Sequence, residues 1–331
     1  MVNAAKPSLS IPAFSGSVPP RKAPKPKILF LDDEERILNA LRAIFRFKYE
    51  VLTSTSGADA LEILRKQSVA VVISDQRMPQ MTGVEFLQQA KEISPDTLRI
   101  LLTGFADMRA IIGSVNEGEV FRFLNKPWGN QEIQAVVSDA VDVALATRST
   151  SVLGDSTSTA TTGRNIFVLV KCRTPELFAE LQAENSGDLT MLHADTQVAA
   201  LAILQSKPIS ILVTRFDEDD LTQAENSVEF VKLLKRELPE LLTIGMAEHT
   251  DHEKVVDLIN QAKVHRYVVL PSRPGRIIFY VRSAIDQYQK NIENPALLRR
   301  QSVDKPEKKD VLIPDTVMSK IRSIRKFFSA G

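Results

Sequence analysis

Short apolar runs that alternate with helical segments constrain the fold of this chain more than any other feature. In the first half these runs cover residues 28–31, 69–73, 99–102 and 120–124. The segments between them repeat apolar residues at the spacing of a helix, as Leu38, Leu41 and Phe45 do. Because such runs are buried on both faces, they predict an α/β fold in which helices cover both sides of a parallel sheet.

Chemically capable side chains follow these runs. They are Asp32 and Asp33 after the first run, Asp75 after the second, Thr103 after the third and Lys126 after the fourth. Ligands of parallel sheets bind outside the carboxyl ends of the strands, so we expect these side chains to meet in one crevice. The three carboxylates are hard oxygen ligands that suit Mg²⁺, and a divalent cation would relieve their mutual repulsion.

Asp75 is the residue for which this arrangement predicts a reaction. Its carboxylate would attack a phosphoryl group in line, as aspartate does in other aspartyl-phosphate chemistry. Lys126 would pair with a phosphoryl oxygen in the transition state and in the product. Thr103 would donate its hydroxyl to another phosphoryl oxygen. The sequence therefore predicts a chain that accepts phosphate on Asp75.

Residues 27–148 resemble a response-regulator receiver domain of bacterial two-component signalling. The resemblance rests on the acidic pair, on Asp75 in the pattern Asp-x-x-Met-Pro-x-Met-x-Gly, on Thr103 followed by a small residue, and on Lys126-Pro127. It implies a flavodoxin-like fold of five parallel strands in the order 2-1-3-4-5 with five helices. It also implies Mg²⁺ as cofactor and phosphorylation by a sensor histidine kinase or a phosphotransfer protein.

The resemblance implies further roles for individual residues. The backbone carbonyl of Arg77 would join Asp32, Asp33 and Asp75 at the metal. Phe123 would be the aromatic switch residue, which turns inward when Thr103 moves. The switch would act on the face made by helix 4, strand 5 and helix 5, which could also form a homodimer. The bond between Lys126 and Pro127 is expected to be cis.

Plainer roles for some of these residues stay open. An acidic pair after a strand is also a common N-terminal cap, so Asp32 or Asp33 could serve the following helix in that way. Phe123 could equally be an ordinary core residue of its strand. The side chain of Arg77 is expected to tune access to the site rather than to bind a ligand.

The same alternation of runs and helical segments returns in the second half, at residues 166–169, 189–192, 209–213, 241–244 and 264–269. Residues 115–123 align with residues 259–267, and this register carries Lys126-Pro127 onto Leu270-Pro271. The chemical positions are then occupied by Ala247 for the threonine, by Arg215 for the acceptor, and by Val170 and Lys171 for the acidic pair. We interpret residues 165–291 as a degenerate receiver that folds but does not take phosphate by this chemistry.

For the other polar residues of the second half we favour structural roles over functional ones. Arg215 and Lys171 would attract an anion at a sheet edge, but the favoured interpretation is that they face solvent or the acidic residues 217–220. The four histidines lack metal-ligand spacing and are expected on the surface. Cys172 is the only cysteine, so a disulfide framework is excluded.

The tails differ in charge from the body of the chain. Residues 1–27 hold five basic residues and no acidic one, which predicts a disordered basic arm. Residues 149–164 predict a flexible linker, and residues 292–331 a basic tail with a short amphipathic helix at its end. That helix is expected to dock on its own receiver or on a partner rather than on a membrane. Since the net charge is only +1, the body between the tails is acidic.

Two classes of function remain open. The chain is either a response regulator that changes its protein–protein interactions on phosphorylation, or a phosphate sink or relay member. A cyclic-dinucleotide or transcription output encoded elsewhere ranks lower. We expect no enzymatic output beyond Mg²⁺-dependent self-phosphorylation, because a Gly-rich phosphate loop is missing, and we expect no DNA binding. The lack of a signal peptide or a run of about 18 apolar residues predicts a cytoplasmic protein.

Overall fold

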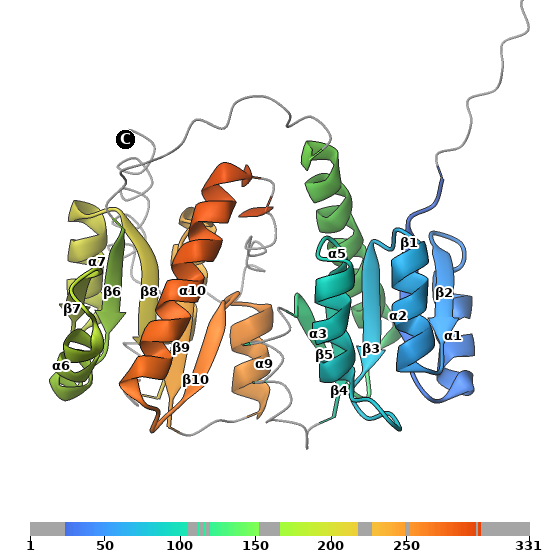
Figure 1. Cartoon of the computed structure of the whole chain (residues 1–331), viewed down its shortest axis with the longest axis horizontal. Coiled ribbons are helices and arrows are strands. Elements are labelled where there is room, and N and C mark those ends of the chain that lie inside the picture. Colours follow the sequence, from blue (N-terminus) through green and yellow to red (C-terminus); the bar gives the residue numbers. More distant parts are fainter. Residues whose placement is uncertain are drawn as a thin grey trace, which may run out of the picture.

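Two five-stranded parallel sheets stand side by side in the molecule (Figure 1). This computed structural model describes residues 24–104, 112, 116, 120–151, 166–217, 227–248, 252–295 and 297–298. The predicted fold class of two flavodoxin-like sheets in tandem is confirmed. Most of the predicted arm, linker and C-terminal tail lies outside the described residues. Among the helices of the described residues, none combines the length and the apolar character needed to cross a membrane.

The first sheet has the strand order β2-β1-β3-β4-β5, which is the order that the resemblance implies. Its strands are β1 (Lys27–Leu31), β2 (Glu50–Ser54), β3 (Val71–Asp75), β4 (Leu98–Thr103) and β5 (Arg122–Asn125). Its helices are α1 (Glu35–Phe45), α2 (Gly57–Lys66), α3 (Gly83–Ile93) and α5 (Asn130–Ser151). The apolar runs did not predict β2, since it is an edge strand with only one buried residue.

Both faces of this sheet are buried under helices. Along β1, Ile28 and Phe30 belong to the cluster that contains the buried residues of α1 and α5, whereas Leu29 and Leu31 belong to the cluster of α2 and α3. This alternation follows from the two-residue period of a strand. Each large apolar side chain that is fully buried in this way contributes roughly 1.5–3 kcal/mol relative to an exposed one.

Local signals fix where the helices begin. Thr82 and Glu85 form a capping box at the start of α3, in which each side chain bonds the backbone of the other residue. Ser56 accepts a hydrogen bond from the backbone of Asp59 at the start of α2. The cap before α3 matters for the site, because it ends the loop that follows Asp75.

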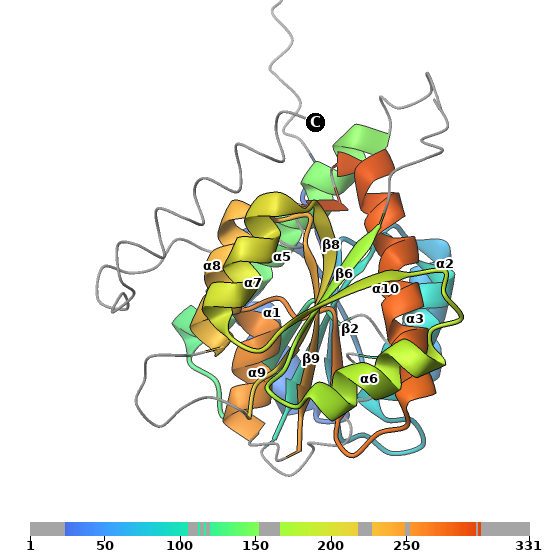
Figure 2. The same ribbon diagram turned by 90° about the vertical axis from the view of Figure 1, so that its left-hand side faces the viewer.

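The second sheet has the order β10-β9-β8-β6-β7, which reads in reverse as the order of the first sheet. Its strands are β6 (Phe167–Lys171), β7 (Thr190–Ala194), β8 (Ile209–Arg215), β9 (Leu242–Ala247) and β10 (Arg266–Val269). Its helices are α6 (Pro175–Glu184), α7 (Gln197–Ser206), α8 (Ser227–Glu237), α9 (His252–Asn260) and α10 (Pro274–Glu293). Helices α7, α8 and α9 cover one face, and α6 and α10 cover the other (Figure 2).

The strand register corrects one part of the predicted correspondence between the halves. Leu31 pairs with Ser74, the residue before Asp75, and Lys171 pairs with Thr214, the residue before Arg215. Lys171 therefore corresponds to Leu31. The acidic pair corresponds to Cys172 and Arg173, not to Val170 and Lys171. The apolar runs alone could not show this, because a bulge shifts the register between Phe167 and Val168.

Pro127 follows β5 and Pro271 follows β10, as the sequence alignment of the two halves predicts. The Lys126-Pro127 bond is cis, which confirms the prediction, and the Leu270-Pro271 bond is cis as well. Asp75 is the last residue of β3 and Arg215 the last residue of β8, while Thr103 and Ala247 end β4 and β9.

Candidate functional site

Asp75 lies at the carboxyl edge of the first sheet with both carboxylate oxygens engaged. The side chain is buried at the end of β3. Its Oδ2 accepts a hydrogen bond of 3.1 Å from the backbone N–H of Arg77. Its Oδ1 lies 2.6 Å from the ammonium of Lys126. These contacts fix the plane of the carboxylate, so its position is set before any substrate arrives.

Asp32 lies beside Asp75 because β1 and β3 are neighbours in the sheet. It is only 1% exposed, and its Oδ1 accepts a 2.9 Å hydrogen bond from the backbone of Glu34. Its Oδ2 lies 3.3 Å from the ammonium of Lys126. Burial raises the pKa of Asp32, and the negative charge of Asp75 raises it further. Asp32 therefore shapes the turn into α1 and also takes part in the charged cluster.

Lys126 joins the two carboxylates. It follows β5, and its ammonium also lies 5.5 Å from the centre of the Trp128 ring. Burial by itself would lower the pKa of Lys126, but its hydrogen bonds and charge contacts with Asp75 and Asp32 outweigh this and raise it. The amine is therefore a fixed cation at the point where a transferred phosphoryl group would gain negative charge.

The structure does not bring every predicted residue into this cluster. Thr103 is completely buried, and its hydroxyl donates to the carbonyl oxygen of Gly104 at 3.3 Å. Asp33 is exposed, and so is Arg77. Phe123 is 1% exposed and points into the core, a position that suits both an ordinary core residue and a switch residue.

A divalent metal fits the donors that are present. Within the described residues, no group of three or more His, Cys, Asp or Glu side chains is close enough to hold a metal. Two buried carboxylates, however, suffice for Mg²⁺, which uses one or two carboxylates and keeps several waters. Asp32 and Asp75 supply these, and burial, with a smaller contribution from the charge of Asp75, raises the pKa of Asp32. The exposed Asp33 and the backbone carbonyl of Arg77 would complete the predicted set.

Gly83 is a site residue whose role the sequence did not explain. A Cβ atom at this position would lie 2.2 Å from the carbonyl oxygen of Asp75 and 2.8 Å from Cδ1 of Leu101. Its backbone N–H donates to the carbonyl of Gln76 at 3.0 Å, which closes the loop after β3. The only signal in the sequence was the glycine that ends the motif beginning at Asp75.

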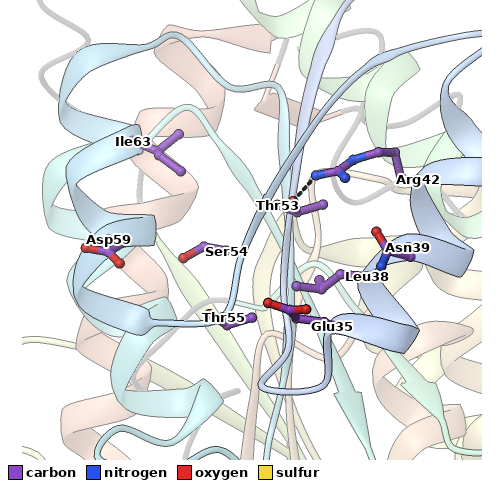
Figure 3. Close-up of a pocket in the computed structure, with 9 residues that line it drawn as sticks. All are labelled: Glu35, Leu38, Asn39, Arg42, Thr53, Ser54, Thr55, Asp59 and Ile63. Atoms are coloured by element: carbon purple, nitrogen blue, oxygen red, sulfur yellow. Dashed lines mark hydrogen bonds between the residues drawn. The ribbon is translucent and has the colours of Figure 1, made fainter.

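A polar hollow of about 490 Å³ opens next to the site, between α1, β2 and α2 (Figure 3). Glu35, Asn39, Arg42, Thr53, Thr55 and Asp59 supply most of its lining. Across the hollow, Arg42 donates a hydrogen bond to Thr53. The apolar runs missed this surface because they missed β2.

The corresponding edge of the second sheet holds a different cluster. Arg215 forms ion pairs of 3.0 Å with Asp217 and with Glu248, and donates to the hydroxyl of Thr174 at 3.4 Å. Burial alone would raise the pKa of Asp217, but the hydrogen bonds from Arg215 and from the backbone of Glu248 lower it. The predicted pairing of Arg215 with the acidic residues 217–220 is confirmed for Asp217, while residues 218–220 lie outside the described part of the chain.

Two expectations for the second half are wrong. Lys171 does not face solvent, since it is 2% exposed and donates to Ser227 at 2.9 Å. His265 is buried, not on the surface, and burial together with the nearby positive charges lowers its pKa well below the usual value. The sequence could not show either result, because Lys171 bonds to Ser227 and His265 lies near the charge of Lys235, and both partners are distant along the chain.

Comparisons with known proteins agree with the geometry of the first sheet. Residues 28–138 match the family model described as response regulator receiver domain. The chain is 39% identical over 115 residues to the hydrogenase transcriptional regulatory protein HoxA of Cupriavidus necator, covering 35% of this chain and 24% of that protein. It is 33% identical over 112 residues to the DNA-binding transcriptional regulator NtrC of Escherichia coli, covering 34% and 24%.

Solved structures give matches of similar extent. One is described as adenylate cyclase from Rhodopirellula baltica, with 37% identity, 40% of this chain and 99% of that chain covered, and a TM-score of 0.38. A response regulator receiver domain protein from Clostridium thermocellum has 34% identity, 35% and 94% coverage, and a TM-score of 0.34. The chain spans about a quarter of the length of the curated relatives named above. Residues 28–138 are a response regulator receiver domain.

Proposed function

We propose that the chain is a response regulator that accepts a phosphoryl group on Asp75 from a histidine kinase or a phosphotransfer protein. The observation that carries this proposal is the contact of 2.6 Å between Asp75 and Lys126 beside the buried carboxylate of Asp32. A buried aspartate held by a cation at a strand end is suited to attack an electrophilic phosphorus atom. The phosphorylated chain would then bind its protein partners differently.

The residues of the site divide the reaction between them. Asp75 forms the bond to phosphorus through one carboxylate oxygen, while the bond between phosphorus and the donor breaks. The backbone N–H of Arg77 orients the carboxylate, and Lys126 offsets charge on the phosphoryl oxygens. Mg²⁺, when bound by Asp32, Asp33, Asp75 and the carbonyl of Arg77, supplies further charge neutralisation. Thr103 exchanges its bond to Gly104 for one to the phosphoryl group.

The second sheet belongs, in this proposal, to a degenerate receiver that takes no phosphate. Arg215 stands where the acceptor would be, and Cys172 and Arg173 stand where the acidic pair would be. Ala247 ends β9 at the position of Thr103, and Leu270 precedes the proline in place of the lysine. At these positions the second sheet thus lacks the acceptor carboxylate, the acidic pair and the lysine that the first sheet has.

Substitution of Asp75 tests the acceptor. The full-length Asp75→Asn variant, treated with acetyl phosphate and Mg²⁺, should take no label on any residue, because the amide cannot form an acyl phosphate. Asp96→Asn is the matched control, since Asp96 is exposed at the opposite edge of the sheet and should leave labelling unchanged. Mass spectrometry of the intact chain and its peptides gives the readout. Labelling that persists in Asp75→Asn would place the acceptor elsewhere.

A phosphate sink or relay member is the alternative function. Such a protein drains phosphate from a kinase but binds nothing differently afterwards. Pull-downs with and without acetyl phosphate separate the two functions, since only the first predicts a partner whose binding depends on phosphorylation. The relatives named as transcription regulators share only about a quarter of their length with this chain, so the expectation that it does not bind DNA stays a prediction.

A further inference from the structure

The two sheets meet through two asparagine side chains that bond to opposite halves. The amide of Asn116 donates to the carbonyl oxygen of Tyr267 at 2.8 Å and accepts from its N–H at 3.0 Å. The amide of Asn260 donates to the carbonyl oxygen of Phe123 at 2.8 Å and accepts from its N–H at 2.9 Å. Each asparagine therefore satisfies both backbone groups of one residue on the terminal strand of the other sheet.

These contacts have the pattern of a two-fold interface. Asn116 lies seven residues before Phe123, and Asn260 lies seven residues before Tyr267. In an interface of that kind the same patch occurs on both partners, so residue i meets j and residue j meets i. The helices obey the same relation, because α2 and α3 lie on the opposite side of the sheets from their counterparts α7 and α8 (Figure 2).

The contact is apolar around the four hydrogen bonds. Phe123 and Tyr267 are 1% and 2% exposed and belong to one hydrophobic cluster that contains residues of both halves. Val120 of the first half and Ile259 of the second are members of the same cluster. At its border the ammonium of Lys263 lies 5.3 Å from the centre of the Phe121 ring. A surface that is buried, apolar and hydrogen-bonded in this way is typical of a lasting contact rather than a transient one.

We propose that the second half is a built-in partner that holds the β5 edge of the receiver domain in the place that a second copy of the chain would otherwise take. This explains how the chemical positions of the second sheet can be replaced while its fold and its asparagine are kept. It also changes the expectation for association. The full chain does not dimerise through this face, because the second half of the same chain already covers the β5 surface that a homodimer would use.

Hydrogen exchange on the full-length protein tests the proposal. The amides of Phe123 and Tyr267 should be protected in the wild type. Asn116→Ala removes the two hydrogen bonds to the backbone of Tyr267. The amide of Tyr267 should then exchange roughly 5- to 150-fold faster than in the wild type. Because the proposal has the two halves separate as one unit, the same variant also accelerates exchange at Phe123, whose own bonds are untouched, and Asn260→Ala has the reciprocal effect. Asn39→Ala on α1 is the control and should change neither amide.

Sedimentation of the same samples gives a second measurement. The wild type should run as a monomer over a range of concentrations. Fast exchange at both amides of the wild type would overturn the proposal. So would an effect of Asn116→Ala confined to Tyr267, or a wild-type dimer that Asn116→Ala abolishes, since that dimer would use the face between two chains.

Discussion

The contact between Gly83 and Asp75 allows a strong perturbation of the acceptor without touching its chemistry. In Gly83→Ala the new Cβ would lie 2.2 Å from the carbonyl oxygen and 2.9 Å from the carbonyl carbon of Asp75, whereas ordinary contact begins at 3.4 Å. The backbone of Asp75 or of α3 must therefore move by about 1 Å. A displacement of this size can lower a rate about 100-fold, and overpacking of this kind costs about 1–3 kcal/mol of stability.

The assay is the initial rate of labelling by acetyl phosphate with Mg²⁺, measured beside urea unfolding of the same variant. Gly129→Ala is the matched control, because a Cβ at that position meets only one atom, at 4.0 Å. We expect labelling of Gly83→Ala to be slower by up to about 100-fold and labelling of Gly129→Ala to stay near the wild-type rate. A folded Gly83→Ala protein that is labelled at the wild-type rate would refute the claim that a Cβ at position 83 displaces Asp75.

Three further predictions concern a hydroxyl, a cation and a buried amine. Thr103→Ala should still be labelled, since Asp75 and Lys126 remain, but phosphorylation should no longer change its affinity for a partner in titrations. If phosphorylation changes the affinity of Thr103→Ala as much as that of the wild type, the hydroxyl of Thr103 does not carry the signal. Arg215→Asp should add no second site of labelling in peptide mass spectrometry, because Leu270 still replaces the lysine. Burial lowers the pKa of Lys235 to about 7, whereas the pKa of an unfolded lysine is about 10.4. The unfolded chain thus binds more protons between these values, and stability should rise with pH from about 7 to about 10. Lys235→Met should remove that slope in urea unfolding, and a slope that persists would contradict the assignment.

The reactive part of the site could be predicted from the sequence because it depends on strand ends. Asp75 and Lys126 follow apolar runs whose direction is fixed in a parallel sheet, so their side chains meet for a reason that the sequence contains. β2 escaped prediction because an edge strand with polar residues shows no apolar run. The sequence alignment placed the counterparts of the acidic pair two residues too early, at Val170 and Lys171 instead of Cys172 and Arg173. The hydrophobic pattern could not correct this, because a bulge in strand pairing leaves no trace in hydrophobicity.

The contacts between the halves could not be predicted at all. The aligned segments already contained Asn116 and Asn260 at equivalent positions. Nothing in their spacing showed that each amide reaches the backbone of the other half, because that depends on how two folded sheets are placed. The burial of Lys171 and His265 is of the same kind, because it depends on residues distant in the sequence, namely Ser227 and Lys235.

The covered edges of β5 and β10 also bear on aggregation. Two open sheets have four terminal strands, and a bare terminal strand is a template on which another chain can add itself. The bonds from Asn260 and Asn116 occupy backbone groups of β5 and β10, and α9 packs against β5. The other two terminal strands are β7 and β2, and Glu50 of β2 forms an ion pair with Lys27. A protease that cuts between the halves and lets them drift apart would bare both protected edges at once. The nicked protein would then be lost by precipitation rather than by loss of its site.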